Sequence, residues 1–293
     1  MSQSLTPIEL GGAITAAPGA GWLRLGWRAL AGFDFLAMRS AQGGERVIQS
    51  GIARRSIGGL IGTTNSTALN LLGQATAPTA LATATNRPVA TTNRATRSSR
   101  IGYVSAATAA AVTGHYYNSA SFLRLALGDG AGAGGFEYVC HFVPSDAAVV
   151  AGARMFAGIS NSAAAPTNVE PSSLTNVIGI AQLSTSTNLQ IVFGGSTPQA
   201  PIDLGANFPA GGQSADLYRL TLTSDPNDNT KVGYRVDRIG TAFSAEGVLP
   251  NTTPGTTLPA TTTLMHHRLW RTNNATALAV GIDLVQVVIE YDF

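Results

Sequence analysis

From residue 101 to its end, the chain repeats one pattern, in which a short apolar run is followed by a cluster of turn-forming residues. In the run 216–222, Tyr218, Leu220 and Leu222 point the same way, which is the period of two of a pleated strand. Clusters such as 194–198 and 225–229 separate the runs, and no helical period intervenes. Many short strands with turns between them predict an antiparallel β-sandwich.

The composition supports an all-β chain. Charged residues are 12% of the 293, about half of the ~25% in ordinary soluble domains. Surface helices normally carry Glu and Lys on their wet face, so a helix-rich architecture is disfavoured. With 18 Lys and Arg against 16 Asp and Glu, a broad electrostatic grip on nucleic acid is also disfavoured. No run of ~18 apolar residues and no secretory signal pattern is found, so we expect neither membrane insertion nor secretion.

Charge is distributed unevenly along the chain. Residues 1–125 hold eleven Arg against three acidic residues, whereas residues 126–293 hold seven basic against thirteen acidic ones. The Arg-rich part is suited to an acidic partner and the remainder to solvent. A chance distribution in a charge-poor chain is the alternative.

The first 60 residues predict a small β-meander, with strands near 21–28, 32–38 and 45–49. The competing interpretation is a basic amphipathic helix over 22–39. That helix would contain Gly26 and Gly32, each of which costs ~1 kcal/mol relative to Ala. We therefore expect a β-meander over 1–60.

Residues 61–100 are rich in Thr, Ala and Asn and poor in large apolar side chains. Such a segment buries too little apolar surface to order itself against ~1–2 kcal/mol of backbone entropy per residue. It is predicted to be an extended connector, either a flexible linker or a strip laid against another part of the protein. The β-sandwich head domain is then predicted over 101–293, of jelly-roll or concanavalin-like type.

The last run, 278–291, is apolar on both faces. Ile282, Leu284 and Val288 share one face, and Val285, Val287, Ile289 and Tyr291 share the other. A strand that is apolar on both faces is covered on both. We therefore predict that Val285, Val287, Ile289 and Tyr291 form an oligomer interface.

Catalytic motifs are scarce. Glycoside hydrolysis needs two carboxylates about 5–9.5 Å apart, one with a raised pKa. Glu137, Glu170 and Glu246 are possible members, but no pairing is recognisable. No nucleophile elbow, zinc-protease helix, phosphate loop or Cys-x-x-Cys pair is present, so we predict no enzyme, no cofactor and no catalytic residue.

Metal binding is not predicted either. His266 and His267 are adjacent on a strand, so their side chains leave opposite faces, and one buried and one exposed histidine is expected. Asp225, Asn227 and Asn229 copy the spacing of a calcium loop, but Val236 stands where its Glu would be, and an Asx-type hairpin turn is favoured. Cys140 is expected to be a small buried hydrophobe, with a reactive thiol as the alternative.

A few side chains are candidates for surface binding. Tyr116, Tyr117 and Trp270, with the neighbouring Asn273, have the rings and the amide that stack on sugar faces and bond to hydroxyl groups. Anchoring in a core or an interface is the more common use of such aromatic residues.

Several motifs together resemble the distal domain of tailed-bacteriophage fibre proteins. The resemblance covers residues 95–293, and more weakly 16–60 through Pro18-Gly-Ala-Gly21 and Gly43-Gly-Glu-Arg-Val47. The motifs that carry it are Gly152-Ala-Arg-Met-Phe-Ala-Gly-Ile159, Asn168-Val-Glu-Pro-Ser-Ser-Leu-Thr-Asn176, Ile178-Gly-Ile180, Ile202-Asp-Leu-Gly-Ala-Asn-Phe-Pro209, Val232-Gly-Tyr-Arg-Val236, Leu269-Trp-Arg-Thr-Asn-Asn274 and Val280-Gly-Ile-Asp-Leu284.

The resemblance implies a homotrimeric, non-enzymatic virion fibre, assembled in the host cytoplasm. Its N-terminal region would be held by another virion protein, and its head would adhere to a bacterial surface polysaccharide or an outer-membrane receptor. The chain lacks the coiled-coil or collagen-like shaft of long fibres. A polysaccharide-degrading tailspike and a cementing protein of the head or neck without a receptor role are the alternatives.

Overall fold

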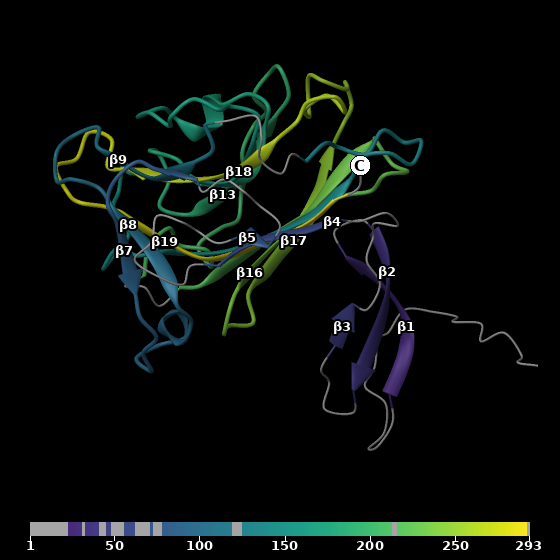
Figure 1. The fold of residues 1–293 in the computed structure, drawn as a ribbon, viewed down its shortest axis with the longest axis horizontal. Coiled ribbons are helices and arrows are strands. Elements are labelled where there is room, and N and C mark those ends of the chain that lie inside the picture. Colours follow the sequence, from purple (N-terminus) through teal and green to yellow (C-terminus); the bar gives the residue numbers. More distant parts are fainter. Residues whose placement is uncertain are drawn as a thin grey trace, which may run out of the picture.

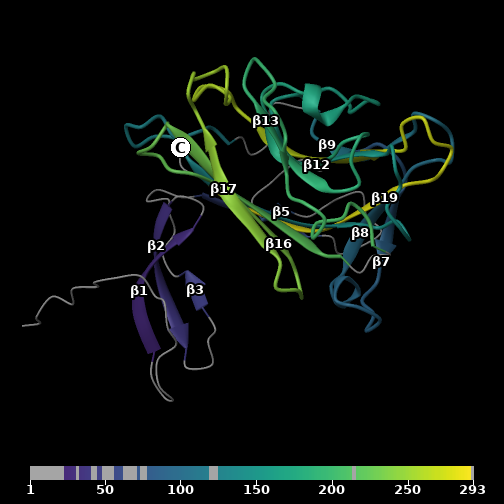
Figure 2. The same cartoon turned by 180° about the vertical axis from the view of Figure 1, so that it is seen from behind.

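The computed structural model describes residues 23–30, 33–40, 45–47, 56–61, 71–72, 78–118, 125–212 and 216–291. Two large antiparallel sheets lie face to face, and a small third sheet lies at one side of them (Figures 1 and 2). The predicted antiparallel β-sandwich is therefore confirmed. The described ranges contain no helix with the length and apolar character that a membrane crossing requires.

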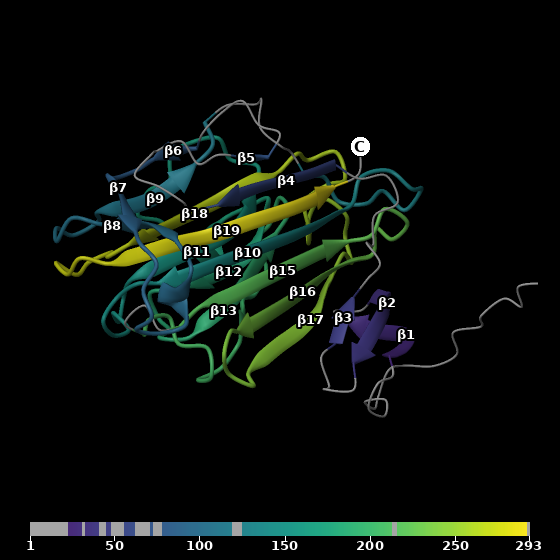
Figure 3. The same cartoon turned by 60° about the horizontal axis from the view of Figure 1, so that its bottom comes forward.

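The small sheet is the predicted three-stranded meander. It consists of β1 (Leu23–Leu30), β2 (Phe33–Ser40) and β3 (Glu45–Val47), hydrogen-bonded in that order. The competing helix over 22–39 is wrong, because Gly26 and its neighbours pair with β2 across an antiparallel ladder. Figure 3 shows the meander beside the end of the larger sheet.

The larger sheet has nine strands. Seven of them follow one another in the order β17 (Ser244–Pro250), β16 (Lys231–Arg238), β15 (Tyr218–Ser224), β10 (Phe136–Pro144), β19 (Gly281–Tyr291), β4 (Ser56–Ile61) and β5 (Leu71–Leu72). The other two are β8 (Arg100–Val104), which pairs with the first half of β19, and β7 (Ala84–Arg87), which pairs with β8.

The opposing sheet has seven strands. Their order is β14 (Ile202–Asp203), β13 (Leu189–Gly194), β12 (Val177–Gln182), β11 (Arg154–Ser160), β18 (His266–Thr272), β9 (Val112–Tyr116) and β6 (Thr79–Ala80). Two short 3-10 helices complete the described elements, η1 (Ala95–Arg97) and η2 (Pro171–Ser173).

One continuous core fills the space between the two sheets. Tyr138 and Phe142 of β10 and Tyr218 of β15 meet Met155 and Leu269 from the opposing sheet, and all five are fully buried. Each such side chain contributes ~1.5–3 kcal/mol relative to an exposed one. The core therefore comes from the alternate residues that the period of two places on the inner faces.

The predicted connector 61–100 joins the sandwich. β6 extends the seven-stranded sheet, and β7 pairs with β8 in the nine-stranded sheet. β4, which ends at residue 61, pairs with β19 on one side and with β5 on the other. The sandwich thus begins by residue 56, well before the predicted boundary at 101, because this apolar-poor strip obtains its hydrogen bonds from the edges of both sheets.

The last strand contains a bulge that the sequence pattern concealed. His141 of β10 pairs with Gln286 and Phe142 pairs with Leu284, so Val285 is an extra residue on β19. Such a bulge reverses the alternation of side chains beyond it. Ile282 and Leu284 before the bulge and Val287 and Ile289 after it therefore face the same core, whereas Val288 does not belong to that core.

The assignment of Ile282 and Leu284 to one face and of Val287 and Ile289 to the opposite face is thus wrong. Val287 and Ile289 lie in the chain's own core, together with Ile282 and Leu284 before the bulge. Val285 is 8% exposed and belongs to a separate small cluster of buried residues. Tyr291 is half-buried and packs on the main core, so the side chains assigned to an oligomer interface are largely covered within one chain.

Candidate functional site: a cleft under the β11–β12 loop

The long connection between β11 and β12 folds back over the outer face of the seven-stranded sheet. It spans residues 161–176 and includes η2. Its base is closed by a hydrogen bond from the Asn161 N–H to the Asn176 carbonyl oxygen, 3.1 Å long. Asn176 has φ of 50°, a left-handed conformation that asparagine tolerates better than most residues. The loop therefore stands over the sheet as a defined structure.

Small side chains leave room beneath this loop. Gly158 of β11 is in register with Gly179 of β12 on one side and with Arg268 of β18 on the other. A Cβ atom at Gly179 would lie 2.9 Å from ring atoms of Phe156. The glycine at 179 thus lets the Phe156 ring lie flat on the sheet.

An apolar cluster forms part of the floor. Phe156 and Trp270, which are also in register, stack with their ring centroids 6.4 Å apart. Val169 and Leu174 of the loop pack on the cluster to which these rings belong. This packing holds the loop down, and it also explains why Trp270 is only 1% exposed.

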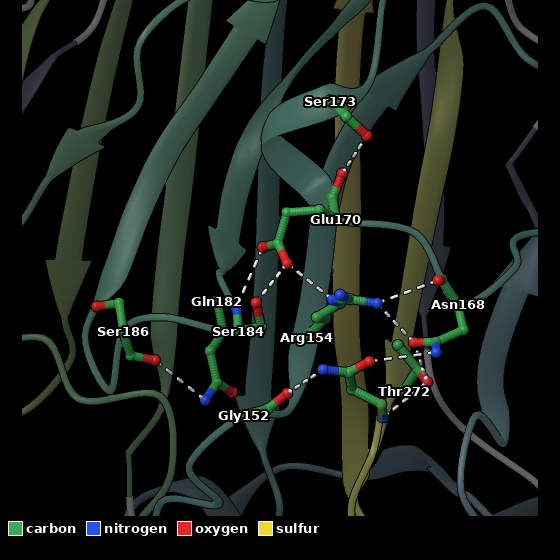
Figure 4. Close-up of polar contacts among 10 residues, drawn as sticks. Gly152, Arg154, Asn168, Glu170, Ser173, Gln182, Ser184, Ser186 and Thr272 are labelled. Atoms are coloured by element: carbon green, nitrogen blue, oxygen red, sulfur yellow. Dashed lines mark hydrogen bonds and ion pairs between the residues drawn. The ribbon is translucent and has the colours of Figure 1, made fainter.

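Arg154 anchors the far end of the loop (Figure 4). Its Nε donates to Oε2 of Glu170 at 2.8 Å, and its Nη1 donates to the Asn168 side-chain oxygen at 2.9 Å. The Glu170 carboxylate also accepts from the Ser184 N–H at 3.0 Å and from the Ser184 hydroxyl at 2.5 Å. Each partner of this ion pair is thus satisfied by several hydrogen bonds.

Further polar contacts tie the same end of the loop to β18 and to the turn before β11. The Thr272 hydroxyl donates to Oδ1 of Asn168 at 3.2 Å. The Asn168 amide donates to Oδ1 of Asn274 at 3.2 Å, and the Asn274 amide donates to the Gly152 carbonyl oxygen at 3.1 Å. These contacts make the loop end a continuous hydrogen-bonded network.

Arg268 anchors the near end of the loop in a different way. Its Nη1 donates to the Ser162 carbonyl oxygen at 2.8 Å, and its Nη2 donates to the Ala164 carbonyl oxygen at 2.5 Å. The guanidinium carbon lies 6.0 Å from the centre of the Tyr116 ring, a cation–π contact. Burial lowers the pKa of Arg268 to about 10, and Tyr116 opposes that shift.

Between the two anchors is a cleft of about 660 Å³, within the size range of ligand sites. Phe156, Trp270 and Arg268 line its floor. Its walls contain the polar residues Ser160, Asn161, Ser162, Thr167, Ser173, Thr175 and Asn176, together with the apolar residues Ala164, Ala165, Pro166, Val169, Leu174 and Val177. Such a lining offers hydroxyl and amide groups to a polar ligand and an apolar floor to its carbon face.

The residues predicted to bind at the surface differ in their exposure. Tyr117, Trp270 and Asn273 are buried, the last with its amide donating to the carbonyl oxygens of Ala106, Thr108 and Leu278. Asn273 therefore anchors a turn, and the prediction of surface contact is wrong for Tyr117 and Asn273. Trp270 is covered by the loop and borders the cleft only at its floor. Tyr116 is half-exposed and packs on Arg268.

The candidate carboxylates do not form a hydrolytic pair in the cleft. Glu170 is held by Arg154, and Glu246 is paired with Arg235 on the other sheet. Glu137 lies opposite Glu290 on the outer face of the nine-stranded sheet, where burial first and Glu290 second raise its pKa. Among the described residues that line the cleft, no Asp or Glu is found.

Both adjacent histidines are buried, so the prediction of one exposed histidine is wrong. His266 meets the Tyr117 ring edge-on, with centroids 6.1 Å apart. His267 enters the core, where its Nε2 lies 2.9 Å from Nε2 of His115 and its Nδ1 lies 2.7 Å from the hydroxyl of Tyr138. Burial lowers the pKa of His115 to about 3 and that of His267 well below its ordinary value.

The predictions of an Asx-type turn at 225–229 and of a buried Cys140 are confirmed. Asp225 accepts a hydrogen bond from the Asn227 N–H at 2.8 Å, which makes an Asx turn between β15 and β16. Cys140 is buried, and burial raises the pKa of its thiol to about 12. Within the described ranges, no cluster of three His, Cys, Asp or Glu side chains is arranged to hold a metal ion.

The two arginines whose hydrogen bonds hold the loop over the cleft were not predicted from the sequence. Arg154 and Arg268 lie on strands that are adjacent in the sheet but more than a hundred positions apart in the chain. One signal was present, since each arginine alternates with buried apolar residues, Arg154 with Met155 and Arg268 with Leu269, and therefore lies on the outer face of the sheet. That signal gives no indication of which loop would cover them.

Comparisons with known proteins agree with this architecture. No protein-family model matches the sequence, and no curated protein matches it. Among solved structures, the chain is similar to arcelin-5, a lectin-like defence protein from Phaseolus vulgaris, with a TM-score of 0.50 and 9% identity over 82% of this chain and 100% of that one. At such identity the likeness shows a shared fold.

Two further solved structures are similar at lower scores. One is a protein of unknown function from Shewanella oneidensis MR-1, with a TM-score of 0.46 and 13% identity over 83% of this chain and 89% of that one. The other is the CBM2 module of the evolved Dit of Lactobacillus casei BL23 phage J-1, with a TM-score of 0.39 and 10% identity over 66% and 77% of the two chains.

Proposed function

We propose that this chain is a carbohydrate-binding virion protein of a tailed bacteriophage, that it is not an enzyme, and that it holds a glycan of the host surface in the cleft under residues 161–176. The N-terminal region attaches the protein to the particle, and the chain assembles as a homotrimer. The observation that carries the proposal is the cleft itself, with its apolar floor and its walls of hydroxyl and amide groups.

Three further observations support the proposal. The fold is shared with a lectin-like protein. Sequence motifs over residues 95–293 resemble those of phage fibre heads. The charge-poor surface and the absence of a disulfide framework, with one buried cysteine, suit a β assembly that works outside a cell without covalent staples.

Assembly has its own support in the meander. On β1, Leu25 is 48% and Trp27 is 38% exposed, and their cross-strand partners Met38 and Leu36 lie on the same side of the sheet. A three-stranded sheet with one apolar face is stable when that face is covered. We expect multi-angle light scattering of the intact chain to find three copies, and a monomer of 30.1 kDa at micromolar concentration would contradict the trimer.

A binding assay tests the central claim. We expect purified bacterial surface polysaccharides to bind to the protein in isothermal titration calorimetry, without the appearance of new reducing ends. Ser173→Trp, which fills the cleft from an exposed position on its wall, should abolish binding, whereas Ser172→Trp next to it, outside the lining, should leave binding intact. Equal binding of the polysaccharide by both variants would show that the cleft is not the binding site.

The tailspike alternative predicts a different outcome of the same assay. Hydrolysis by paired carboxylates would generate reducing ends and would require an Asp or Glu within reach of the bound sugar. The cementing alternative predicts that no polysaccharide binds at all. The formation of reducing ends therefore favours the tailspike. The absence of both binding and new reducing ends favours the cementing protein.

A further inference from the structure

The charge of Arg268 has no counter-ion in the part of the chain that the structure describes. The side chain is 7% exposed, and no described carboxylate lies within 4.0 Å of its guanidinium. Its two hydrogen bonds go to neutral carbonyl oxygens, and its Nε has no hydrogen-bond partner. A guanidinium has five N–H donors, so most of its capacity is unused.

Other buried arginines of this chain have a carboxylate partner. Arg271 is paired with Asp146, and Arg100 is paired with Asp283 at 3.0 Å. A buried charge without a partner is costly, because neither water nor an opposite charge replaces its lost hydration. The chain therefore supplies carboxylates where an arginine serves packing, and it supplies none at Arg268.

Arg268 is also the charged group of the cleft. It is the one ionised side chain among the described residues that line the cleft, where the other polar groups are hydroxyls and amides. The cleft therefore combines a fixed positive charge with neutral hydrogen-bonding walls. A ligand that carried a negative charge would complete the ion pair in a setting of low exposure, where such pairs are strongest.

We propose that the cleft selects an acidic saccharide, whose carboxylate or phosphate group acts as the counter-ion of Arg268. This inference rests on the proposed function, and it narrows the ligand from glycans in general to anionic glycans. The neutral walls bind the hydroxyl groups of the sugar, and Arg268 discriminates by charge.

Matched pairs of ligands test the selectivity of the intact chain. The pairs are tetragalacturonate and its carboxyl-reduced form, sialyllactose and lactose, and mannose phosphate and mannose. We expect the acidic member of at least one pair to bind about tenfold or more tightly than the neutral member, the difference expected for a charge-assisted hydrogen bond. The uronate and phosphate pairs show which anion is preferred.

Variants at an exposed position of the cleft separate charge from folding. Ala165 lines the cleft and is exposed, so Ala165→Glu adds a repelling charge without disturbing the core. At low salt, we expect Ala165→Glu to weaken binding of the acidic ligand severalfold more than Ala165→Gln does, because the two new side chains have the same size and only the glutamate is charged. Arg268→Gln should remove the preference for the acidic member, and Arg268→Lys should retain part of it.

The outcomes distinguish this inference from the proposed function. Equal binding of acidic and neutral members, with loss of both in Ser173→Trp, would overturn the acidic selectivity and leave glycan binding in place. The same conclusion would follow if Ala165→Glu and Ala165→Gln behaved alike. Failure of the three pairs and of the surface polysaccharides to bind would overturn both proposals.

Discussion

The arginines on the outer faces of the two sheets differ in whether each has a carboxylate partner. On the nine-stranded sheet, Arg219 and Arg235 share the carboxylate of Asp237, at 2.7 and 2.8 Å, and Arg235 also contacts Glu246 at 2.8 Å. On the seven-stranded sheet, Arg154 has the Glu170 carboxylate, whereas Arg268 has carbonyl oxygens and an aromatic ring.

This difference separates two uses of a charged side chain. The ladder of Arg219, Asp237, Arg235 and Glu246 joins three adjacent strands across their outer face and is complete within the chain. Arg268 is more buried than the arginines of that ladder, yet it lacks the partner that they possess. We interpret the complete face as structural and the incomplete one as the binding face.

The largest effect should come from acid, which acts on the core that both faces share. The pKa values of His115 and His267 are lowered by burial, so below about pH 6.5 the unfolded chain binds protons that the folded chain excludes. Their contribution is therefore complete above that pH and is lost as the pH falls. We expect the free energy of unfolding to decrease by about 4 kcal/mol between pH 7 and pH 5.

Chemical denaturation at a series of pH values measures this loss. His141, on the outer face of the nine-stranded sheet, has its pKa lowered to about 4 by burial and by Arg219, and it adds to the same slope. The slope of the free energy of unfolding against pH reflects the number of protons taken up on unfolding. The variant His141→Gln should therefore reduce that number by about one and leave the contribution of His115 and His267. A free energy that is flat from pH 7 to pH 5 would contradict the neutral histidine pair.

Glu170→Gln tests the complete ion pair of the seven-stranded face. It removes the charge that Arg154 faces at a partly buried site, so we expect a loss of about 2 kcal/mol in the free energy of unfolding. Glu246→Gln is the matched control on the other face, where the carboxylate is more exposed, and about 0.5 kcal/mol or less is expected. Equal losses in urea denaturation would show that burial does not distinguish the two pairs.

Asp237→Asn tests the ladder of the nine-stranded face. Burial alone would raise the pKa of Asp237, but hydrogen bonds from Arg235 and Arg219 outweigh it and lower the pKa. The carboxylate therefore stabilises the fold above its ordinary pKa of ~3.9, and this contribution is lost as the pH falls further. We expect the variant to lose about 1 kcal/mol at pH 7 and to approach the parent chain near pH 3, in denaturation curves at both pH values.

Arg268→Met should have the smallest effect on stability. It removes a buried charge that has no carboxylate partner, and this gain offsets the loss of two hydrogen bonds to the loop. We expect the free energy of unfolding to change by less than about 1 kcal/mol, whereas Arg154→Met should lose about 2 kcal/mol. A loss at Arg268 as large as that at Arg154 would remove the distinction between the two anchors.

Local pattern was sufficient for much of the fold. The period of two in 216–222 became β15, the turn residues of 225–229 became an Asx turn, and Gly26 and Gly32 argued correctly against a helix in the N-terminal region. Each of these depends on the conformational preference of a few consecutive residues. Because neighbours along the chain determine them, the sequence is informative about them.

Two features were less predictable from the sequence: the face of the sheet to which a side chain points, and the loop that covers it. One extra residue at Val285 brought Val287 and Ile289 to the core face of Ile282 and Leu284, since a bulge is defined by the partner strand and not by the strand that contains it. Trp270 was expected at a surface, but a loop from between two other strands covers it. Both errors arose where the outcome depends on a segment distant in the sequence.

By itself, the sequence determined that this protein is a β-sandwich with a small meander, because alternation and turn chemistry are local properties of the chain. Only the tertiary structure decided that residues 161–176 cover the seven-stranded sheet and that Arg268 is buried there without a carboxylate. The reason is physical: burial and the pairing of charges depend on which distant segments meet, and the packing of the two sheets selects those segments.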